Sequence, residues 1–547
     1  MADDTPHAGV AADVGAVLAY HDRTKHAFER FAPALGYLDW ATQPDPFRRY
    51  AGAPRVDLPR TVPVPAESSA PFDLVGIGDC LRCAFGLTAW KQAGATRWAL
   101  RANPSSGNLH PTEAYLLAAT AALGTPGAGW SVSHYAPREH ALETRAAFGE
   151  GPAPLPEGVC LVGLSSIHWR EAWKYGERAF RYCQHDVGHA IGALVYSAAR
   201  LGWRVRLLPG WSDTDIAAVL GLNPPGNAAP GSTEPEHPDC LLAVGPGDVD
   251  AAVALDVDAC VASARRASWA GLPNQLSPSR VEWPAVDDVA AATVRTDRGR
   301  PAGVAPPADR RGAVLDPGVG VGSVGRDWLI RRRSAVSFDG SGMLSREAFA
   351  RMVARVQPGG GAGQEPSPVW SIDGGPPQVR LIWFVHRVEG LAPGIYGQPR
   401  DPEALAELRG GLRSDLLWEP VEGIDGLYLL APLDARALAR RLSCDQHIAA
   451  DGYFGMAMLA PLASALETHG PWFYRRLFWE CGLVGQVLYL EAELAGGRAT
   501  GIGCFFDDPV HAVLGIEGHR LQSLYHFSMG VPVEDSRLTT EPGYAWE

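Results

Sequence analysis

Apolar residues recur at helical spacing in two long stretches of the chain, residues 186–202 and residues 480–496, and both stretches end at a glycine. An apolar residue at every third or fourth position is typical of an amphipathic helix, and glycine often terminates such a helix. Short runs of β-favouring residues predict isolated strands at residues 204–208, 241–244, 379–385 and 523–528. Helices that alternate with isolated strands predict an α+β fold.

The two halves of the chain resemble each other. Residues 216–222 (IAAVLGL) reappear 294 positions later as residues 510–516 (VHAVLGI). The same shift brings glycines and acidic residues into register without a gap, pairing Gly188 with Gly482, Gly202 with Gly496, Gly221 with Gly515, Asp213 with Asp507 and Asp186 with Glu480. This self-similarity indicates a tandem repeat. Two similar domains in one chain most simply pack like the halves of a dimer.

One region separates the repeats. Between residues 272 and 325 the apolar periodicity fades, and Pro, Gly, Asp and Arg accumulate, which is typical of an exposed connector. We therefore expect an N-terminal domain at residues 1–271 with an N-terminal extension, a linker at residues 272–325, and a C-terminal domain at residues 326–547.

Charge and composition exclude several classes of protein. The 547 residues carry 48 Lys and Arg against 61 Asp and Glu, a formal net charge of −13, and the longest basic run is Arg331–Arg333. Binding to nucleic acid is therefore not expected. No run approaches the ~18 apolar residues of a membrane helix, and the first residues do not have the pattern of a signal peptide. Nine cysteines, an odd and sparse set, favour reduced thiols and a cytoplasmic protein.

Two segments offer hydrogen-bond donors to a ligand. In the turn Pro104–Asn108, Ser105, Ser106 and Asn108 could bind a flat heteroaromatic ring, although a capped turn explains the same residues. The guanidinium groups of Arg332 and Arg333, followed by the hydroxyl of Ser334, suit a phosphate. A solvated basic turn is the alternative for this second segment.

Two further segments could take part in chemistry. Gly501 and Gly503 would let the backbone approach a ring closely, whereas the register places Leu207 and Pro209 at these positions in the first half. Only one half should therefore use this loop. Lys174 and Tyr175 could transfer protons, but a surface lysine and a packed tyrosine would look the same.

Together these segments resemble the flavin signature of the nitroreductase superfamily: Arg332-Arg333-Ser334, the Pro104–Asn108 turn, the Gly501–Gly503 loop and a late Gly-x-Pro…Arg at Gly530, Pro532 and Arg537. Lys174-Tyr175-Gly176, with the residues that follow, resembles the branch of azoline dehydrogenases that mature thiazole- and oxazole-containing peptides. The resemblance implies two fused nitroreductase-like domains packed as a pseudo-dimer.

The resemblance also implies FMN as cofactor, bound where the two halves meet. Arg332, Arg333, Ser334, Gly501, Gly503 and Arg537 would come from the second half, and Pro104, Ser105, Ser106 and Asn108 from the first. The reciprocal site lacks an Arg-Arg-Ser and has only Pro366-Ser367 in place of the turn. We therefore expect one FMN, with Lys174 or Tyr175 as the residue that accepts a proton.

Three functions follow from this resemblance. The first is an FMN-dependent dehydrogenase that oxidises a peptide or peptide-derived azoline, with other peptide-modifying enzymes as candidate partners. The second is an NAD(P)H-dependent reductase of nitro or quinone compounds. The third is a non-catalytic scaffold of a peptide-modifying complex. The chain would be a monomeric pseudo-dimer or a homo-oligomer.

Some cysteines and an N-terminal segment remain outside these functions. Cys80 and Cys83 form a Cys-x-x-Cys without a second pair, so buried thiols are favoured over a metal site. Cys444 and His447 lie three residues apart on an expected helix and could hold a metal, although no further ligands accompany them. For residues 20–26 (YHDRTKH) we expect only packing or contact with a partner.

Overall fold

Each half of the chain builds a seven-stranded antiparallel sheet. In the computed structural model, the described residues are 5–59, 69–124, 129–148, 154–223, 234–299, 326–361, 366–373 and 375–546. The first sheet has the order β2 (Arg55–Asp57), β7 (Ala141–Phe148), β6 (Trp130–Ala136), β5 (Thr112–Ala119), β8 (Cys160–Ser166), β10 (His237–Gly245) and β9 (Arg204–Leu207). The second has the order β14 (Glu419–Pro420), β15 (Tyr428–Pro432), β13 (Gly394–Gln398), β12 (Arg380–Val385), β16 (Phe454–Ala460), β18 (Gln522–Gly530) and β17 (Arg498–Ile502).

Helices pack on both sheets and between them. The first half contains α2 (Leu74–Phe85), α3 (His168–Tyr175), α4 (Ala179–Arg200), α5 (Asp213–Leu220), α6 (Val257–Arg266) and α7 (Pro284–Ala292). The second contains α8 (Arg326–Arg331), α9 (Arg346–Arg355), α10 (Pro402–Gly411), α11 (Arg436–Leu442), α12 (Ile448–Asp451), α13 (Leu462–His469), α14 (Phe473–Leu494) and α15 (Asp507–Leu514). Short 3-10 helices lie at η1 (Trp40–Thr42), η2 (Ser106–Asn108), η3 (Thr120–Leu123), η4 (Gly176–Arg178), η5 (Ala251–Ala254) and η6 (Pro368–Ser371). This is the α+β architecture that the sequence predicts.

The internal repeat is visible in the fold. The first half runs β8, α3, α4, β9, α5, β10, and the second half runs β16, α13, α14, β17, α15, β18 in the same order. Shifting β8, α3, α4 and α5 by 294 positions reproduces the bounds of β16, α13, α14 and α15 residue for residue. The four predicted strands at residues 204–208, 241–244, 379–385 and 523–528 correspond to β9, β10, β12 and β18.

The two long helices start earlier than the apolar spacing predicts. Helix α4 begins at Ala179 rather than residue 186, and α14 begins at Phe473 rather than residue 480. Their first turns contain buried aromatic residues, Phe180 in α4 and Tyr474 in α14, which bury apolar surface and so extend each helix.

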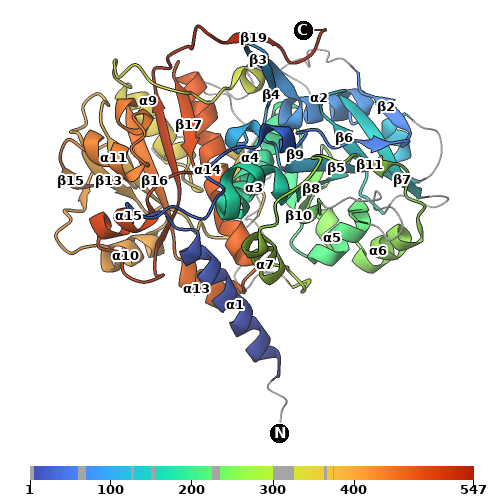
Figure 1. The fold of residues 1–547 in the computed structure, drawn as a ribbon, viewed down its shortest axis with the longest axis horizontal. Helices are drawn as coiled ribbons and strands as arrows, with labels where there is room; N and C mark the ends of the chain where they lie inside the picture. Colours follow the sequence, from blue (N-terminus) through green and yellow to red (C-terminus); the bar gives the residue numbers. More distant parts are fainter. Residues whose placement is uncertain are drawn as a thin grey trace.

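Helices α4 and α14 cross at the centre of the molecule, between the two sheets (Figure 1). They approach closely at the glycines that the register pairs: a Cβ on Gly188 would lie 2.2 Å from Trp479 O, and one on Gly482 would lie 2.3 Å from His185 O. Two ion pairs obey the same symmetry, Arg181–Asp507 at 2.8 Å and Arg475–Asp213 at 2.7 Å. The halves therefore pack about a pseudo-two-fold axis, like the subunits of an isologous dimer.

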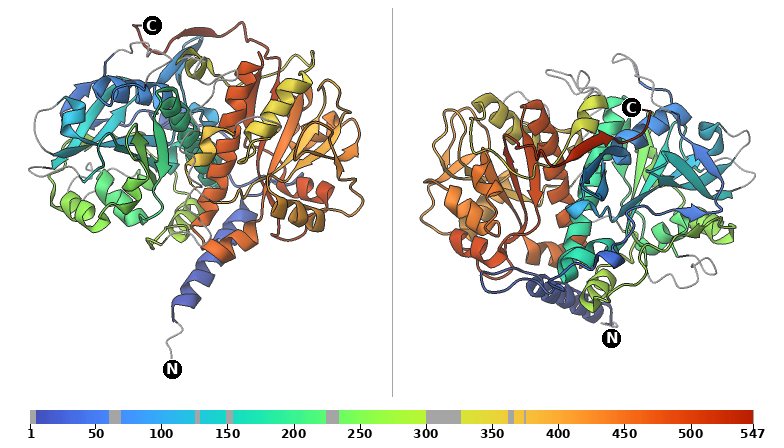
Figure 2. Two further views of the ribbon diagram at one scale, coloured as in Figure 1. Left: turned by 180° about the vertical axis from the view of Figure 1, so that it is seen from behind. Right: turned by 45° about the horizontal axis from the view of Figure 1, so that its top comes forward.

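Each terminus packs on the opposite half. Helix α1 (Thr5–Arg23) protrudes from the body in Figure 1, and its last turn reaches the second half, where His21 hydrogen-bonds Tyr474 and Gln522. At the other end, β19 (Thr539–Pro542) crosses to the first half, as Figure 2 shows. There it joins β3 (Leu87–Ala93) and β4 (Thr96–Arg101) in a three-stranded sheet. These exchanges tie the two halves into one body.

The expected linker contains ordered structure over residues 272–299. Strand β11 (Leu272–Pro273) pairs with β1 (Tyr50–Ala51), and α7 buries Val286 and Val289 in the main hydrophobic core. In the sequence, the surrounding Pro and Asp residues hide the short apolar periodicity of α7. The rest of the expected linker, residues 300–325, lies outside the described residues.

Candidate functional site between the two halves

The Pro104–Asn108 turn connects β4 to β5 and contacts α4. Gly107 and Asn108 take left-handed φ angles of 64° and 57°, which glycine and asparagine adopt most easily. Ser105 Oγ accepts the His110 N–H at 2.8 Å, and the Ser106 N–H points to both oxygens of Asp186 at 3.3 Å. Ser105, Ser106 and Asn108 are nevertheless only partly buried, so this turn remains accessible.

Lys174 and Tyr175 lie directly over this turn. A Cβ on Gly107 would be 2.8 Å from the Tyr175 hydroxyl and 3.0 Å from Lys174 Nζ. The Lys174 side chain is exposed, and its Nζ lies 5.2 Å from the centre of the Tyr175 ring. Burial, followed by the nearby Glu171, raises the pKa of Tyr175 well above its usual value. Tyr175 therefore keeps its proton at neutral pH and is a donor rather than a base.

Two buried carboxyl groups lie beneath Lys174 and the turn. Burial raises the pKa of Asp186 to about 8, and burial together with the charge of Asp186 raises the pKa of Glu171. Glu171 Oε1 is 3.4 Å from Ser105 Oγ, and Glu171 Oε2 has no hydrogen-bond partner within the described part of the chain. Such a pair can hold a proton at neutral pH, as neighbouring carboxyls do when both cannot ionise.

Arg332 reaches this turn from the second half. Its guanidinium donates to the carbonyl oxygens of Ala102 and Arg101, each at 3.1 Å, and lies 5.0 Å from the centre of the Tyr489 ring. The side chain is buried, yet Nη1 has no partner among the residues that the structure describes. An unpaired donor on a buried cation is costly, so Nη1 is a candidate point of contact for an anionic ligand.

The neighbouring donors are used inside the protein. Arg333 donates to the carbonyl oxygens of Ile330, Arg332 and Thr88. The Tyr489 hydroxyl accepts the Gly501 N–H at 2.9 Å and hydrogen-bonds Ser334 Oγ at 2.8 Å. Tyr489 thus hydrogen-bonds Ser334 and Gly501, two residues that the family resemblance assigns to a ligand.

Gly501 and Gly503 are needed for close contacts with tyrosines of the two halves. A Cβ on Gly501 would lie 1.8 Å from the Tyr525 hydroxyl, and one on Gly503 would lie 1.9 Å from Cε1 of Tyr182. The Tyr182 ring in turn packs against Tyr175, with centroids 4.5 Å apart. The glycine loop therefore contacts the Lys174–Tyr175 pair through one intervening aromatic ring.

Arg537 lies apart from this group. Its side chain is 85% exposed and pairs with Asp535 at 2.7 Å. The acid two residues earlier holds the guanidinium in solvent, so the structure does not bring the late arginine to the other candidate residues.

The reciprocal position is closed. The Leu207 N–H, which the register pairs with that of Gly501, donates to Ile372 O at 2.9 Å, and Tyr196 hydrogen-bonds Ser367 at 2.8 Å. The segment that replaces the Pro104–Asn108 turn is thereby paired directly to the end of β9.

Sequence reasoning did not assign Asp186, Glu171, Tyr489 and Tyr525 to this group, whereas Tyr182 is among the residues after Lys174-Tyr175-Gly176 that carry the family resemblance. The register pairing of Asp186 with Glu480 was the one available signal, and both acids accept backbone N–H groups, Asp186 from Ser106 and Glu480 from Gln378. The tyrosines resemble ordinary core residues in the sequence.

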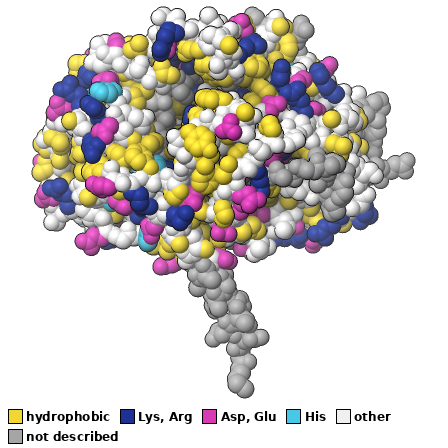
Figure 3. Space-filling view, viewed as in Figure 1, with side chains coloured by type: hydrophobic (Ala, Val, Ile, Leu, Met, Phe, Trp, Pro, Cys, Tyr) yellow, Lys and Arg dark blue, Asp and Glu magenta, His cyan; other side chains and the backbone are white. Residues whose placement is uncertain are grey.

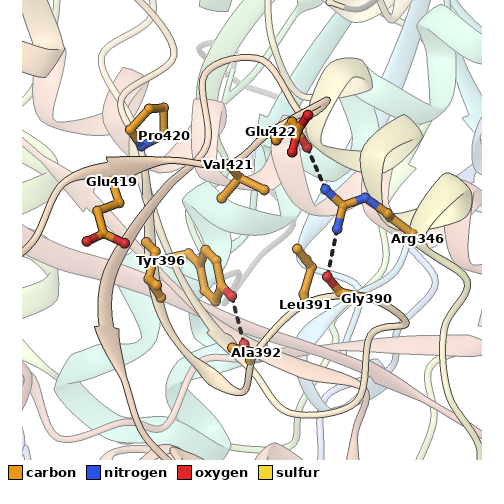
Figure 4. A pocket seen from close by; sticks show the side chains of 10 residues that line it. Arg346, Gly390, Leu391, Ala392, Tyr396, Glu419, Pro420, Val421 and Glu422 are labelled. Carbon is orange, nitrogen blue, oxygen red and sulfur yellow. Dashed lines mark hydrogen bonds between the residues drawn. The ribbon is translucent and has the colours of Figure 1, made fainter.

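Two cavities lie elsewhere. One, of about 640 Å³, opens beside the outer strands of the second sheet (Figure 4), where Arg346 bridges the carbonyl oxygens of Gly390 and Glu422. The other, of about 170 Å³, lies beside His168 and His237 near α7. Neither is lined by a residue that the sequence predicts for the site. We therefore assign the candidate functional site from the chemistry of its residues rather than from the volume of a cavity.

The cysteine predictions have different outcomes. Cys80 and Cys83 are buried in α2, where Cys83 Sγ contacts Asp79 at 3.8 Å and burial raises the pKa of Cys83 to about 11. Cys444 does not lie on a helix: it has a φ of 54° in the turn before α12, which begins at Ile448. Within the described parts of the chain, no three His, Cys, Asp or Glu residues gather as a metal site would require.

On the face in Figure 3, Lys and Arg side chains are interspersed with Asp and Glu. Among the residues that the structure describes, no helix is long and apolar enough to cross a membrane.

Comparison with solved structures identifies the fold. Neither family models nor curated proteins gave a match. A protein from Anabaena variabilis ATCC 29413, assigned as a nitroreductase, matches with a TM-score of 0.67 at 21% identity, over 95% of this chain and 99% of that one. The Escherichia coli microcin synthetase McbBCD complex matches with a TM-score of 0.28 at 18% identity, over 37% of this chain and 70% of that one. That score is too low to carry an argument. The first match, which spans both halves, shows that this chain has a nitroreductase-like fold.

Proposed function

We propose that the protein is an FMN-dependent oxidoreductase with one site, formed between an N-terminal domain (residues 1–271) and a C-terminal domain (residues 326–547). The observation that carries the proposal is the convergence of the Pro104–Asn108 turn, Lys174 and Tyr175 with Arg332 and the Gly501–Gly503 loop from the opposite half. The nitroreductase-like fold supports it, although a shared fold does not fix a function.

The residues present fit FMN in part. The buried Arg332 Nη1 without a partner suits an anionic group, and the accessible Ser105, Ser106 and Asn108 suit polar ring atoms. Ser334 and the Gly501 N–H would become available if the Tyr489 hydroxyl turned away. Pro104 would shape the turn and Gly503 would keep the loop close to Tyr182. When bound, a flavin supplies two-electron redox chemistry, and the protein supplies binding, orientation and electrostatics.

The protein's own acids and bases would manage protons at this site. Lys174 is exposed at the edge of the turn and is the candidate group that accepts a proton from a substrate. Tyr175, whose pKa is raised, would donate a hydrogen bond. Asp186 and Glu171 lie one layer below, and their raised pKa values let them store a proton near Lys174.

The substrate we propose is a peptide or peptide-derived azoline, oxidised to the aromatic azole. The exposed position of Lys174 suits a substrate that is part of a larger chain, since the reacting ring would approach from the surface. We therefore expect Lys174→Ala to retain FMN and lose at least tenfold in turnover of a thiazoline peptide, measured as azole formation by absorbance and mass. Lys91→Ala, another partly exposed lysine, is the control. Unchanged turnover in Lys174→Ala would remove Lys174 from the mechanism.

A specific observation supports a second candidate, a non-catalytic scaffold. Tyr489 satisfies Ser334 and Gly501, and carbonyl oxygens satisfy Arg333, so most donors expected for a ligand are already paired. In a site that no longer binds a cofactor, we would expect the donors to be paired within the protein in this way.

FMN binding separates the two candidates. We expect the full chain to bind FMN after incubation and gel filtration, Arg332→Ala to weaken binding at least tenfold, and Arg537→Ala to leave it unchanged. Tyr489→Phe should retain or strengthen binding because it frees Ser334 and the Gly501 N–H. Absence of bound flavin in both the unsubstituted chain and Tyr489→Phe would contradict the FMN-dependent oxidoreductase and favour the non-catalytic scaffold.

A further inference from the structure

Two partly exposed cysteines from distant parts of the second half lie in contact. Cys444 is in the turn between α11 and α12, and Cys504 is in the loop between β17 and α15. Their Sγ atoms are 2.9 Å apart, roughly 0.9 Å longer than a disulfide bond of about 2.0 Å. The other seven cysteines are buried. A small movement would therefore join this pair.

We propose that Cys444 and Cys504 form a thiol–disulfide exchange site for small-molecule disulfides, with Cys504 as the attacking thiol and Cys444 as the resolving thiol. The proposal does not depend on FMN, since it rests on the two thiols and the groups that surround them.

The two segments are fixed relative to each other. The Gln446 side-chain amide donates to Ser443 O at 2.8 Å and to Cys504 O at 2.9 Å, which bridges the turn to the loop. Cys444 and Asp445 both have left-handed φ angles, 54° and 57°. Consecutive non-glycine residues in this region are uncommon and mark positions that the surrounding structure constrains.

Two groups outside the cysteine pair face Cys504, His26 and Arg178. His26 Nδ1 accepts the Ala32 N–H at 2.8 Å, which leaves Nε2 as the protonated ring nitrogen that can donate to Cys504. Arg178 donates to the carbonyl oxygen of Gly503 at 3.2 and 3.3 Å and is itself paired with Asp507. Residues 20–26, which in the sequence suggested only packing or contact with a partner, thus include one of the residues that activate Cys504.

These groups give the two thiols different pKa values. The hydrogen bond between the two thiols, with smaller effects of His26 and Arg178, lowers the pKa of Cys504 to about 5 despite burial. The same hydrogen bond, with burial, raises the pKa of Cys444. One thiolate beside one thiol is the arrangement of an attacking and a resolving cysteine.

The exchange balances without an added metal or cofactor. The Cys504 thiolate attacks one sulfur of a disulfide RSSR, forms Cys504–S–SR and releases RS⁻. Cys444 loses its proton to water, attacks Cys504 Sγ and releases the second RS⁻. The protein is oxidised by two electrons to the Cys444–Cys504 disulfide, and RSSR is reduced to two thiols.

Oxidation of this pair would act on the candidate functional site. Cys504 directly follows Gly503, which contacts Tyr182, and Tyr182 packs on Tyr175. A disulfide would attach the glycine loop to the α11–α12 turn and fix its position beside the Lys174–Tyr175 pair. The redox state of the thiols is thereby coupled to the site.

The first test is the pH dependence of alkylation by iodoacetamide in the full reduced chain, followed residue by residue by mass spectrometry. A thiol with a pKa of about 8.5 loses roughly 80-fold in rate between pH 8 and pH 6, whereas Cys504 should change by less than about twofold. A decrease of 80-fold at Cys504 would overturn the proposal.

The second test uses oxidised glutathione as the probe and non-reducing peptide mapping as the readout. The unsubstituted chain and the control Cys260→Ser should form the 444–504 disulfide. Cys444→Ser should accumulate a mixed disulfide of glutathione on Cys504, and Cys504→Ser should leave Cys444 unmodified. Free thiols at both positions in the unsubstituted chain, or glutathione on Cys444 in Cys504→Ser, would contradict the assigned roles.

Discussion

Asp186 is the acid whose protonation depends most directly on the assembled site. Its native pKa is raised to about 8 by burial, against about 3.9 for an exposed aspartate. Between these values the native state holds more protons than the unfolded state, so the free energy of unfolding falls as pH rises from about 4 to 8. Burying the Asp186 carboxyl beneath the Pro104–Asn108 turn therefore lowers the free energy of unfolding at neutral and higher pH.

We expect Asp186→Asn to remove this pH dependence. Asparagine keeps an oxygen to accept the Ser106 N–H but has no proton to lose, so the variant should gain roughly 3–4 kcal/mol relative to the unsubstituted chain on going from pH 5 to pH 8. Urea unfolding at both pH values measures the gain. Asp288→Asn, on the exposed face of α7, is the control and should show none. An equal pH dependence in Asp186→Asn and the unsubstituted chain would mean that Asp186 is ionised in the native protein.

At the scale of elements, the sequence predicts the parts that depend on local spacing. The long helices, the four strands and the 294-residue register follow from apolar periodicity and glycine positions, which are properties of neighbouring residues. The site does not follow in this way. Ser106 meets Asp186 from 80 positions away, and Arg332 meets Ala102 from 230 positions away. Such contacts join residues distant in sequence, within one half for Ser106 and Asp186 and between the halves for Arg332 and Ala102, and local spacing does not encode them.

The α4–α14 crossing gives a prediction at this scale. Alanine normally stabilises a helix over glycine by roughly 0.5–1 kcal/mol. At Gly188, however, the added Cβ would meet Trp479 O at 2.2 Å, and a backbone atom cannot move aside alone. We expect Gly188→Ala to lower the free energy of unfolding by about 1–3 kcal/mol, measured by urea denaturation.

Gly15→Ala is the matched control for this crossing. Gly15 is an exposed helical glycine in α1, and a Cβ there would meet nothing within 4 Å. It should leave stability unchanged or raise it by up to about 1 kcal/mol. Stabilisation by both substitutions would show that the two helices separate more easily than their packing indicates.

At the scale of the whole molecule, fusion has let two equivalent positions diverge. In a symmetric dimer, a change at one site appears at both, whereas a tandem chain can alter each half separately. Here one position retains the accessible turn, Lys174 and the glycine loop. The other is sealed where Leu207 N–H meets Ile372 O and Tyr196 meets Ser367. The interface remains symmetric, with Arg181–Asp507 and Arg475–Asp213 on either side of the axis, so the asymmetry belongs to the sites rather than to the packing.

This asymmetry predicts the stoichiometry of the proposed cofactor. Because Arg332 serves only the open position, the full chain should bind about one FMN, and Arg332→Ala should lose nearly all of it at the same concentration. Absorbance of the flavin released from a known amount of protein measures both. Two FMN in the unsubstituted chain, with one retained in Arg332→Ala, would mean that the Leu207–Ile372 contact opens to admit a ligand. Loss of all flavin in the variant would instead show that the open position, to which both halves contribute residues, accounts for all of the bound flavin.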